Sequence, residues 1–224
     1  MALRAWAEQF AGGAVSDTMA TLNARHPWSH NDHFHSWILA NLPARRGTAL
    51  DVGCGRGELL AALSPKFAAV HGTDRDGAMR GQAATRCAGL SNVTVHDGTW
   101  VEEPVDLVTM VAVLHHLDVA TALTEVRRLL APGGRFLAVG LAPPQSPTDH
   151  LWDLASAVTN PVIGYVKHPW PSDTTPSTAP FPVKEPDLSF DELREIVLDL
   201  MPGARLRHRL GFRHTIAWTK PGQD

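Results

Sequence analysis

The sequence predicts an α/β protein with a doubly wound, mostly parallel sheet. From residue 48 onward, short β-branched runs alternate with helical patterns, which is typical of βαβ units. A glycine-rich turn follows the first of these runs, and an acidic residue ends the second. The 224 residues are 44% hydrophobic and 19% charged, so the chain can bury a substantial core. We therefore expect a single domain over residues 1–224.

The order of strands and helices follows from where each pattern starts and stops. Apolar and β-branched runs predict five strands, at 48–53, 68–74, 93–96, 106–113 and 135–141. Apolar residues at helical spacing predict helices at 57–64, 77–88 and 119–131. Pro132 and the glycine pair after it are expected to stop the third helix.

The remainder of the chain departs from this rhythm. Residues 142–187 contain ten of the 17 prolines and a helical pattern only near 149–159, so we expect an irregular insertion on the substrate side. Ser189 and Glu192 then form the pattern of a capping box at the start of an amphipathic helix. The end of the chain predicts two strands that turn near Gly211, an antiparallel pair that completes the sheet.

Composition narrows the classes of partner. The net charge is −3 and no long Lys/Arg run is present, which argues against binding to nucleic acid or to an anionic membrane. No apolar stretch is long enough to span a bilayer or to act as a signal peptide, so we expect a cytoplasmic protein. Cys54 and Cys87 lack a C-x-x-C spacing and are expected to be reduced thiols. A small-molecule partner is therefore the default.

The segment "LDVGCGRGELL", residues 50–60, predicts a nucleoside-containing cofactor. Gly53, Gly55 and Gly57 allow a tight turn between strand and helix and a close approach of a ligand to the backbone. Asp74 ends the next strand about 20 residues later, where a carboxylate can accept hydrogen bonds from ribose hydroxyls. Glycine in such a turn can also be purely structural, but the loop and the acidic residue support each other.

The spacing of the glycines separates two cofactor classes. A dinucleotide loop has the pattern G-x-G-x-x-G, whereas this loop is G-x-G-x-G. Asp51 lies two positions before Gly53, where it would repel a pyrophosphate and favour a positively charged ligand. An NAD(P)-dependent oxidoreductase is therefore the disfavoured alternative.

Four motifs in order resemble those of class I S-adenosylmethionine-dependent methyltransferases: "LDVGCGRG", "GTDRD", "VDLVTMVAVLHHLD" and "EVRRLLAPGGRFL". The resemblance covers roughly residues 48–141 and implies a Rossmann-like methyltransferase fold, a doubly wound, mostly parallel sheet of seven strands whose last strand is antiparallel. It implies S-adenosyl-L-methionine as the cofactor and S-adenosyl-L-homocysteine as the product. It also implies that Asp51, Gly53 and Gly55 line the methionine and ribose portion of the cofactor. Asp74 would then hold the ribose hydroxyls, and Arg75 would lie against the adenine.

The adenine end departs from the family pattern. The segment "VHDGTW" has Asp97 before the glycine and Thr99 where many members of the family have an acid. Either Asp97 takes the role of accepting the adenine amino group, or Thr99 replaces it. Trp100 is expected either to cover the purine or to pack in the core.

His115 and His116 follow the fourth expected strand, where open α/β sheets bind their ligands. In similar methyltransferases a histidine in this turn sometimes acts as a base, which favours His116; alternatively, the rings fix the turn by hydrogen bonds. Methyl transfer from a sulfonium depends mainly on alignment of the reactants. A base is needed only when the acceptor arrives protonated.

A second group of histidines lies in "SHNDHFHSW", residues 29–37. Helical spacing would bring two of them together, but no recognisable set of metal ligands accompanies them. The run is similar to one that precedes the first strand in a bacterial subgroup of the resembled family, where this region is a helical cap. This similarity implies that Asn31, His33, Phe34 or His35 touches the methionine end of the cofactor or the substrate. The alternative is N-capping by Asn31 with histidines at the surface.

We therefore expect methyl transfer to an oxygen, nitrogen or carbon atom of a small metabolite, by a monomer or homodimer. The candidate catalytic residues are His116, His115, His33 and His35. Richness in Ala, Gly, Pro and Arg suggests a GC-rich bacterial genome and, by analogy, a tailoring step in secondary metabolism. A regulatory protein that binds the cofactor without catalysis is the other alternative. The expected segments are a helical cap (1–45), a cofactor-binding core (46–141), a substrate-side insertion (142–187), and a final helix with the strand pair (188–224).

Overall fold

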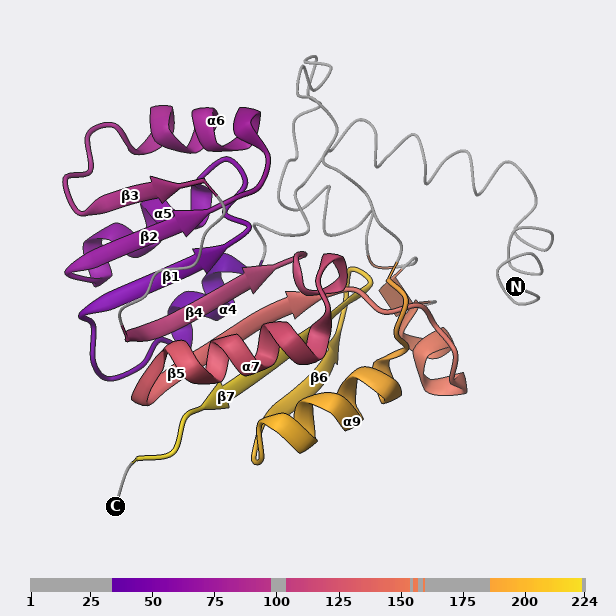
Figure 1. Ribbon diagram of the computed structural model, residues 1–224. Helices are drawn as coiled ribbons and strands as arrows, with labels where there is room; N and C mark the ends of the chain where they lie inside the picture. Colours follow the sequence, from indigo (N-terminus) through magenta and orange to yellow (C-terminus); the bar gives the residue numbers. More distant parts are fainter. Residues whose placement is uncertain (1–33, 98–103, 154, 157–158, 160–185, 223–224) are drawn as a thin grey trace, which may run out of the picture. The chain divides into compact units, whose positions relative to one another are not determined.

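A seven-stranded sheet organises the part of the chain that the computed structural model describes (Figure 1). The described residues are 34–97, 104–153, 155–156, 159 and 186–222. Contacts between residues divide the chain into two compact units. The sheet belongs to the larger unit, which comprises residues 31–143, 184–208 and 213–224; the smaller unit comprises residues 1–30, 144–183 and 209–212.

The strands follow the order β3-β2-β1-β4-β5-β7-β6 across the sheet. Adjacent strands from β3 to β5 are parallel, and β7 runs antiparallel to β5. This arrangement confirms the doubly wound, mostly parallel sheet and its antiparallel C-terminal strand pair. The bounds are β1 Thr48–Val52, β2 Ala69–Thr73, β3 Val93–His96, β4 Val105–Val111, β5 Leu130–Gly140, β6 Arg205–Arg209 and β7 Arg213–Thr219.

The strand order reverses between β1 and β4. The chain proceeds from β1 outward to β2 and β3, and then returns to the other side of β1 with β4 and β5. Open α/β sheets bind ligands outside the carboxyl ends of the strands at such a point. The ends of β1, β2, β4 and β5 are therefore the place to look for a functional site.

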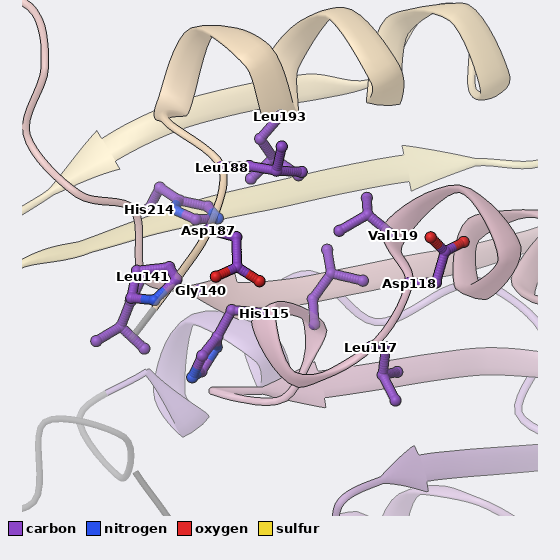
Figure 2. A pocket seen from close by; sticks show the side chains of 12 residues that line it. His115, Leu117, Asp118, Val119, Gly140, Leu141, Asp187, Leu188, Leu193 and His214 are labelled. Carbon is purple, nitrogen blue, oxygen red and sulfur yellow. The ribbon is translucent and has the colours of Figure 1, made fainter. Parts of the chain in front are cut away.

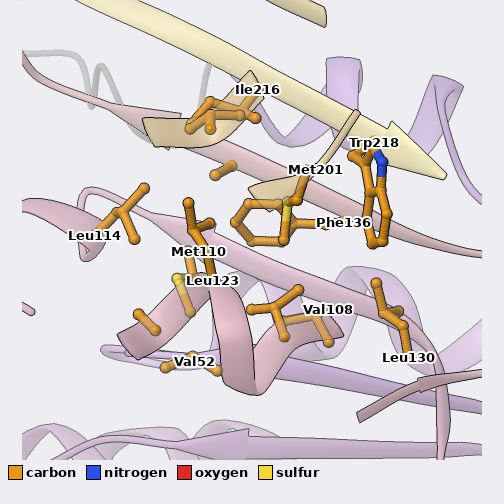
Figure 3. Close-up of a cluster of buried hydrophobic side chains, with 14 of the residues drawn as sticks. Val52, Val108, Met110, Leu114, Leu123, Leu130, Phe136, Met201, Ile216 and Trp218 are labelled. Atoms are coloured by element: carbon orange, nitrogen blue, oxygen red, sulfur yellow. The ribbon is translucent and has the colours of Figure 1, made fainter. Parts of the chain in front are cut away.

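Alternate residues of each central strand enter two different cores. Val52, Val108 and Phe136 face helices α7 and α9, in the core shown in Figure 3. Leu107 and Leu137 face the opposite side with α4, α5 and α6. The helices span α4 His35–Ala40, α5 Glu58–Leu63, α6 Gly77–Cys87, α7 Val119–Leu129 and α9 Phe190–Leu200. The sheet is buried on both faces, as a parallel sheet requires.

The expected boundaries differ most from the structure at α7, β4 and β5. Helix α7 ends at Leu129 rather than 131, because Leu130 is extended and pairs with Val105 at the start of β5. Strand β5 therefore includes the Pro-Gly-Gly segment, and its register with β4 shifts there. Strand β4 ends at Val111 rather than 113, because the backbone of Ala112 is left-handed, with φ of 57°.

Capping side chains position the helices in both units. In the larger unit the expected capping box is confirmed: Ser189 and Glu192 each accept a hydrogen bond from the other's backbone N–H at the start of α9. In the smaller unit helical residues begin at 147, two before the expected start, because Asp149 accepts hydrogen bonds from the backbone N–H groups of Gln145 and Ser146. Among the described helices, none has the length and apolar character needed to cross a membrane.

Candidate functional site

The glycine loop after β1 is held to the end of β2 by its own backbone. The N–H groups of Gly53 and Cys54 both donate to the carbonyl of Thr73, at 2.7 and 2.9 Å. The N–H of Gly55 donates to the Asp74 carboxylate at 2.9 Å. Three successive amides of the loop are therefore already hydrogen-bonded within the protein, and the loop and its acidic partner form one unit.

The first and third glycines of the loop are required by backbone conformation and by packing. Gly53 has φ of 71°, and a β-carbon there would collide with the side chain of Val113. Gly57 has φ of 79°, and a β-carbon there would lie 3.0 Å from the Cα of Ala83 in α6. Gly55, with φ of 54°, also has a left-handed backbone. At Gly53 and Gly57 the absence of a side chain thus serves the close approach of neighbouring segments.

The helix that follows the loop does not favour a phosphate group. Glu58 lies in the first turn of α5 and forms an ion pair with Arg86 at 2.8 Å. A carboxylate at this position opposes an anion at the helix N-terminus. Together with the occupied loop amides, this argues against the pyrophosphate of a dinucleotide.

Asp74 is fixed in place by two backbone N–H groups. Its Oδ2 accepts from Gly55, and its Oδ1 accepts from Asp76 at 2.8 Å. The guanidinium of Arg80 donates to the Asp74 carbonyl at 2.8 Å, which holds the backbone as well. Each carboxylate oxygen can accept one further hydrogen bond, so the group can receive two hydroxyls. The neighbouring Arg75 is exposed.

Asp51 is buried within the sheet beside β4. Its register partner Thr109 donates a hydroxyl hydrogen bond to Oδ1 at 2.6 Å. Burial raises the pKa of this carboxyl from 3.8 to about 7, and the nearby carboxylates of Asp74 and Glu58 also raise it. A positive charge bound nearby would favour the ionised form.

Several residues predicted to contact the cofactor or to form the cap lie at the edge of the residues that the structure describes or outside them. Asp97 is exposed directly after β3, while Thr99 and Trp100 lie outside the described residues. Asn31 and His33 also lie outside them. The described part of the expected cap begins at Phe34, and His35, the first residue of α4, is half-buried. Among the described residues, no cluster of three or more His, Cys, Asp or Glu side chains could hold a metal ion.

The histidine pair forms a short 3-10 helix after β4, at Leu114–His116. The rings of His115 and His116 lie 4.2 Å apart between centroids and are tilted by 38°. The left-handed Ala112 turns the chain before this helix. His115 lines a pocket at the carboxyl ends of β4 and β5, whereas His116 is not among the residues that line it.

This pocket, the β4–β5 pocket, has a volume of about 230 Å³ (Figure 2). His115, Asp187 and His214 gather at the end near Leu141, and Asp118 lies at the other end (Figure 2). Its lining comes from four separate segments of the larger unit: Leu114, His115, Leu117, Asp118, Val119, Gly140, Leu141, Pro186, Asp187, Leu188, Leu193 and His214.

His214 is a pocket residue that the sequence analysis did not identify. It lies in β7 opposite Gly140 of β5, and a β-carbon on Gly140 would collide with its ring. The side chain is buried, and burial lowers its pKa from 6.5 to about 3, with smaller contributions from His208, Arg213 and His115. Its Nε2 has no hydrogen-bond partner among the described residues. The sequence carries no clear signal for it, because β7 begins with three polar residues, Arg213, His214 and Thr215.

Sequence comparisons identify relatives of the chain. A family model described as a methyltransferase domain matches residues 50–136. An uncharacterized methyltransferase of Mycobacterium tuberculosis is 34% identical over 201 residues, which make up 87% of this chain and 98% of that protein. The uncharacterized methyltransferase YcgJ of Bacillus subtilis is 33% identical over 106 residues, 44% of this chain and 42% of that protein. The first of these relatives matches across almost its whole length.

Solved structures share the fold at low sequence identity. A SAM-dependent methyltransferase from Aquifex aeolicus is similar with a TM-score of 0.55 and 18% identity, over 91% of this chain and 97% of that chain. DhpI in a complex with SAH is similar with a TM-score of 0.56 and 18% identity, over 99% of this chain and 94% of that chain. At these identities the likeness concerns the fold.

Proposed function

This chain belongs to the class I S-adenosylmethionine-dependent methyltransferases, and we propose that its methyl acceptor is a small metabolite bound in the β4–β5 pocket. The observation that carries the proposal is the position of this pocket. It opens at the carboxyl ends of β4 and β5, on the other side of the strand reversal from the glycine loop and Asp74. A cofactor at the loop and an acceptor in the pocket would meet beside the reversal point.

The cofactor end of the proposal assigns one role to each acidic group. Asp74, held by two backbone N–H groups, accepts the ribose hydroxyls. Asp51 supplies negative charge toward the positively charged methionine end, beside Gly53 and Gly55. Arg75 lies against the adenine. Asp97 or Thr99 accepts a hydrogen bond from the adenine amino group, and Trp100 is the candidate residue that covers the purine ring.

The acceptor end supplies alignment and, where needed, a base. A lone pair of the acceptor attacks the methyl carbon, the carbon–sulfur bond breaks, and its electron pair remains on sulfur in neutral S-adenosylhomocysteine. If the acceptor atom carries a proton, His115 is the better-placed base because it lines the pocket, and His116 is the alternative. Asn31, His33 and His35 are proposed as cap residues that contact the methionine end of the cofactor or the acceptor.

The proposed acceptor is a small molecule rather than nucleic acid. The chain has a net charge of −3, so it offers no overall attraction to a phosphate backbone. The bias toward Ala, Gly, Pro and Arg supports, by analogy, a tailoring step in secondary metabolism.

Calorimetry with S-adenosylhomocysteine and with NAD tests the cofactor end. We expect binding of S-adenosylhomocysteine and none of NAD. Tight NAD binding without a response to S-adenosylhomocysteine would contradict the proposal and support the oxidoreductase alternative.

Turnover by His115→Asn and His116→Asn tests the acceptor end. Release of S-adenosylhomocysteine is measured with a panel of alcohols, phenols and amines. If His115 is the base, its variant should lose about 10²–10⁴-fold in kcat while keeping its affinity for S-adenosylhomocysteine. Wild-type kcat in the His115 variant would remove the base role. A wild-type protein that binds the cofactor and methylates no member of the panel would favour the regulatory alternative.

A further inference from the structure

The buried ring of His214 offers the β4–β5 pocket one uncharged polar atom. The ring is 3% exposed and packs edge-on against Phe190, with ring centroids 5.8 Å apart. Its Nε2 has no hydrogen-bond partner among the described residues, and His214 lines the pocket. Because burial lowers its pKa to about 3, the imidazole is neutral at physiological pH. A buried polar nitrogen is stabilised when a ligand group pairs with it.

The charges of the pocket disfavour an anionic ligand. Asp118 and Asp187 are both among the lining residues, and none of the described residues that line it is Lys or Arg. Hydrogen bonds from Thr121 lower the pKa of Asp118, so this group is ionised near neutral pH. A carboxylate or phosphate in the pocket would lie near these two acidic side chains, and the described lining residues offer it no Lys or Arg as a partner.

A hydroxyl group is the smallest neutral group that can pair with His214 in either tautomer. In a neutral imidazole one nitrogen donates and the other accepts, and which one is protonated depends on its surroundings. A hydroxyl both donates and accepts, so it pairs with Nε2 in either tautomer. The rest of the lining is mostly apolar, with side chains such as Leu114, Leu188 and Leu193. A volume of about 230 Å³ is below the roughly 300–1,000 Å³ of pockets for drug-sized ligands, which favours a single ring or a short chain.

We propose that the β4–β5 pocket disfavours anions and selects an apolar molecule with a hydroxyl group, and that this hydroxyl pairs with Nε2 of His214. The inference rests on the proposed function in taking this molecule to be the methyl acceptor. His214 is then a residue that determines specificity by positioning the acceptor, and His115 is separate from it.

Two probes of similar size and different charge test the proposal: benzyl alcohol and benzoate at pH 7.5. Binding to the wild-type protein is measured by titration, and the ring nitrogens of His214 are followed by NMR on protein with ¹⁵N-labelled histidine. We expect benzyl alcohol to shift the Nε2 signal and to bind about tenfold more tightly than benzoate. Tighter binding of benzoate would overturn the proposal.

Variants separate the hydrogen bond from the packing. His214→Phe keeps a ring and removes the nitrogen, so its affinity for benzyl alcohol should fall about tenfold. His214→Gln restores a polar group near the position of Nε2 and should recover part of the loss. His208→Phe is the matched control, because His208 stacks on Phe190 and does not line the pocket. Equal affinity of wild type and His214→Phe would overturn the proposal, and if that variant does not fold, the NMR titration and His214→Gln decide.

Binding of S-adenosylhomocysteine distinguishes the two proposals. A wild-type protein that prefers benzyl alcohol but does not bind S-adenosylhomocysteine would overturn the proposed function and leave the selectivity of the pocket intact. A protein that binds S-adenosylhomocysteine and shows no preference among the probes would overturn the present inference alone.

Discussion

The candidate cofactor site at the ends of β1 and β2 is held by backbone hydrogen bonds, whereas the β4–β5 pocket is formed by side chains. In the candidate cofactor site, the backbone N–H groups of Gly53 and Gly55 donate to the Thr73 carbonyl and to the Asp74 carboxylate. In the pocket, His115 and His214 come from segments almost 100 residues apart. The backbone conformation that forms these hydrogen bonds restricts which residues can occupy a few positions of the loop. In the pocket, by contrast, each lining residue can be substituted without changing the others.

This difference predicts that changes in the cofactor site alter stability and cofactor binding together, and that changes in the pocket alter acceptor binding alone. Both regions lie at the carboxyl edge of the same sheet, so their variants can be compared directly. The predictions below test the division, from the largest expected effect to the smallest.

Asp51→Asn should change how the stability of the protein without ligand depends on pH. The pKa of Asp51 rises from 3.8 to about 7 on folding, so its contribution to stability is fully present below pH 3.8 and is lost as the pH rises to about 7. A difference of this size corresponds to about 4 kcal/mol. Relative to Asp51→Asn, the wild type should lose up to about 4 kcal/mol in the free energy of unfolding between pH 4 and 8, measured by urea denaturation.

The control for this prediction is Asp118→Asn, because the pKa of Asp118 is lowered rather than raised. Its contribution is present above the pKa of the unfolded chain and is lost as the pH falls, so the difference from wild type should have the opposite sign. S-Adenosylmethionine is positively charged and should lower the pKa of Asp51, so its binding at pH 6 should release protons. Parallel pH profiles of wild type and Asp51→Asn would show that the carboxyl is not perturbed.

Gly53→Ala should destabilise the protein by about 3 kcal/mol. The left-handed backbone costs a non-glycine residue about 1–2 kcal/mol, and displacement of Val113 adds a similar amount. Gly81→Ala is the matched control, because a β-carbon at Gly81 in α6 meets nothing within 4 Å and should stabilise the helix by about 0.5–1 kcal/mol. Urea denaturation measures both. If Val113→Ala does not recover part of the loss in the double variant, the collision is not the cause.

The proximity of the glycine loop and Asp74 in the candidate cofactor site could be predicted from the sequence because these parts are local. The glycine loop and Asp74 lie at the ends of two consecutive strands, and the parallel pairing of β1 with β2 brings them together. The spacing along the chain therefore carries the spatial information. What the sequence did not reveal is that the loop amides are used internally, since this depends on the register with Thr73.

The pocket could be predicted only in part. His115 and His116 were both predicted because they follow β4, at the edge where ligands bind, and His116 was favoured as the base, whereas only His115 lines the pocket. His214 was not predicted, because its place depends on the pairing of β7 with β5, which sets it opposite Gly140. The early start of β5 at Leu130 was missed for a related reason: pairing with Val105 overrides the turn expected from the proline and glycines.

Asp74→Asn should weaken the binding of S-adenosylhomocysteine by about 1–3 kcal/mol, which is roughly 5–150-fold. The variant loses ribose hydrogen bonds and places an amide N–H against a backbone N–H, of either Gly55 or Asp76. Arg75→Ala is the comparison, because Arg75 is exposed and its contact with adenine should contribute no more than about 1 kcal/mol. Calorimetry measures both. Equal effects at the two positions would contradict the special role of the fixed carboxylate.

Ser189→Ala should have the smallest effect, about 1 kcal/mol in the free energy of unfolding. The change removes half of the capping box of α9. Ser189 lies between Leu188 and Leu193, which both line the pocket, so loss of the cap disturbs that part of the lining. Affinity for benzyl alcohol should therefore fall, and affinity for S-adenosylhomocysteine should stay the same. Asp76→Ala is the matched variant at the other site, because Asp76 caps α6 through the backbone N–H groups of Ala78 and Met79. It should have a similar cost in stability and the reverse pattern of binding, because loss of the cap loosens the segment whose backbone N–H at position 76 orients Asp74. If both variants weakened both ligands equally, the two regions would behave as one cooperative unit and the division between them would be wrong.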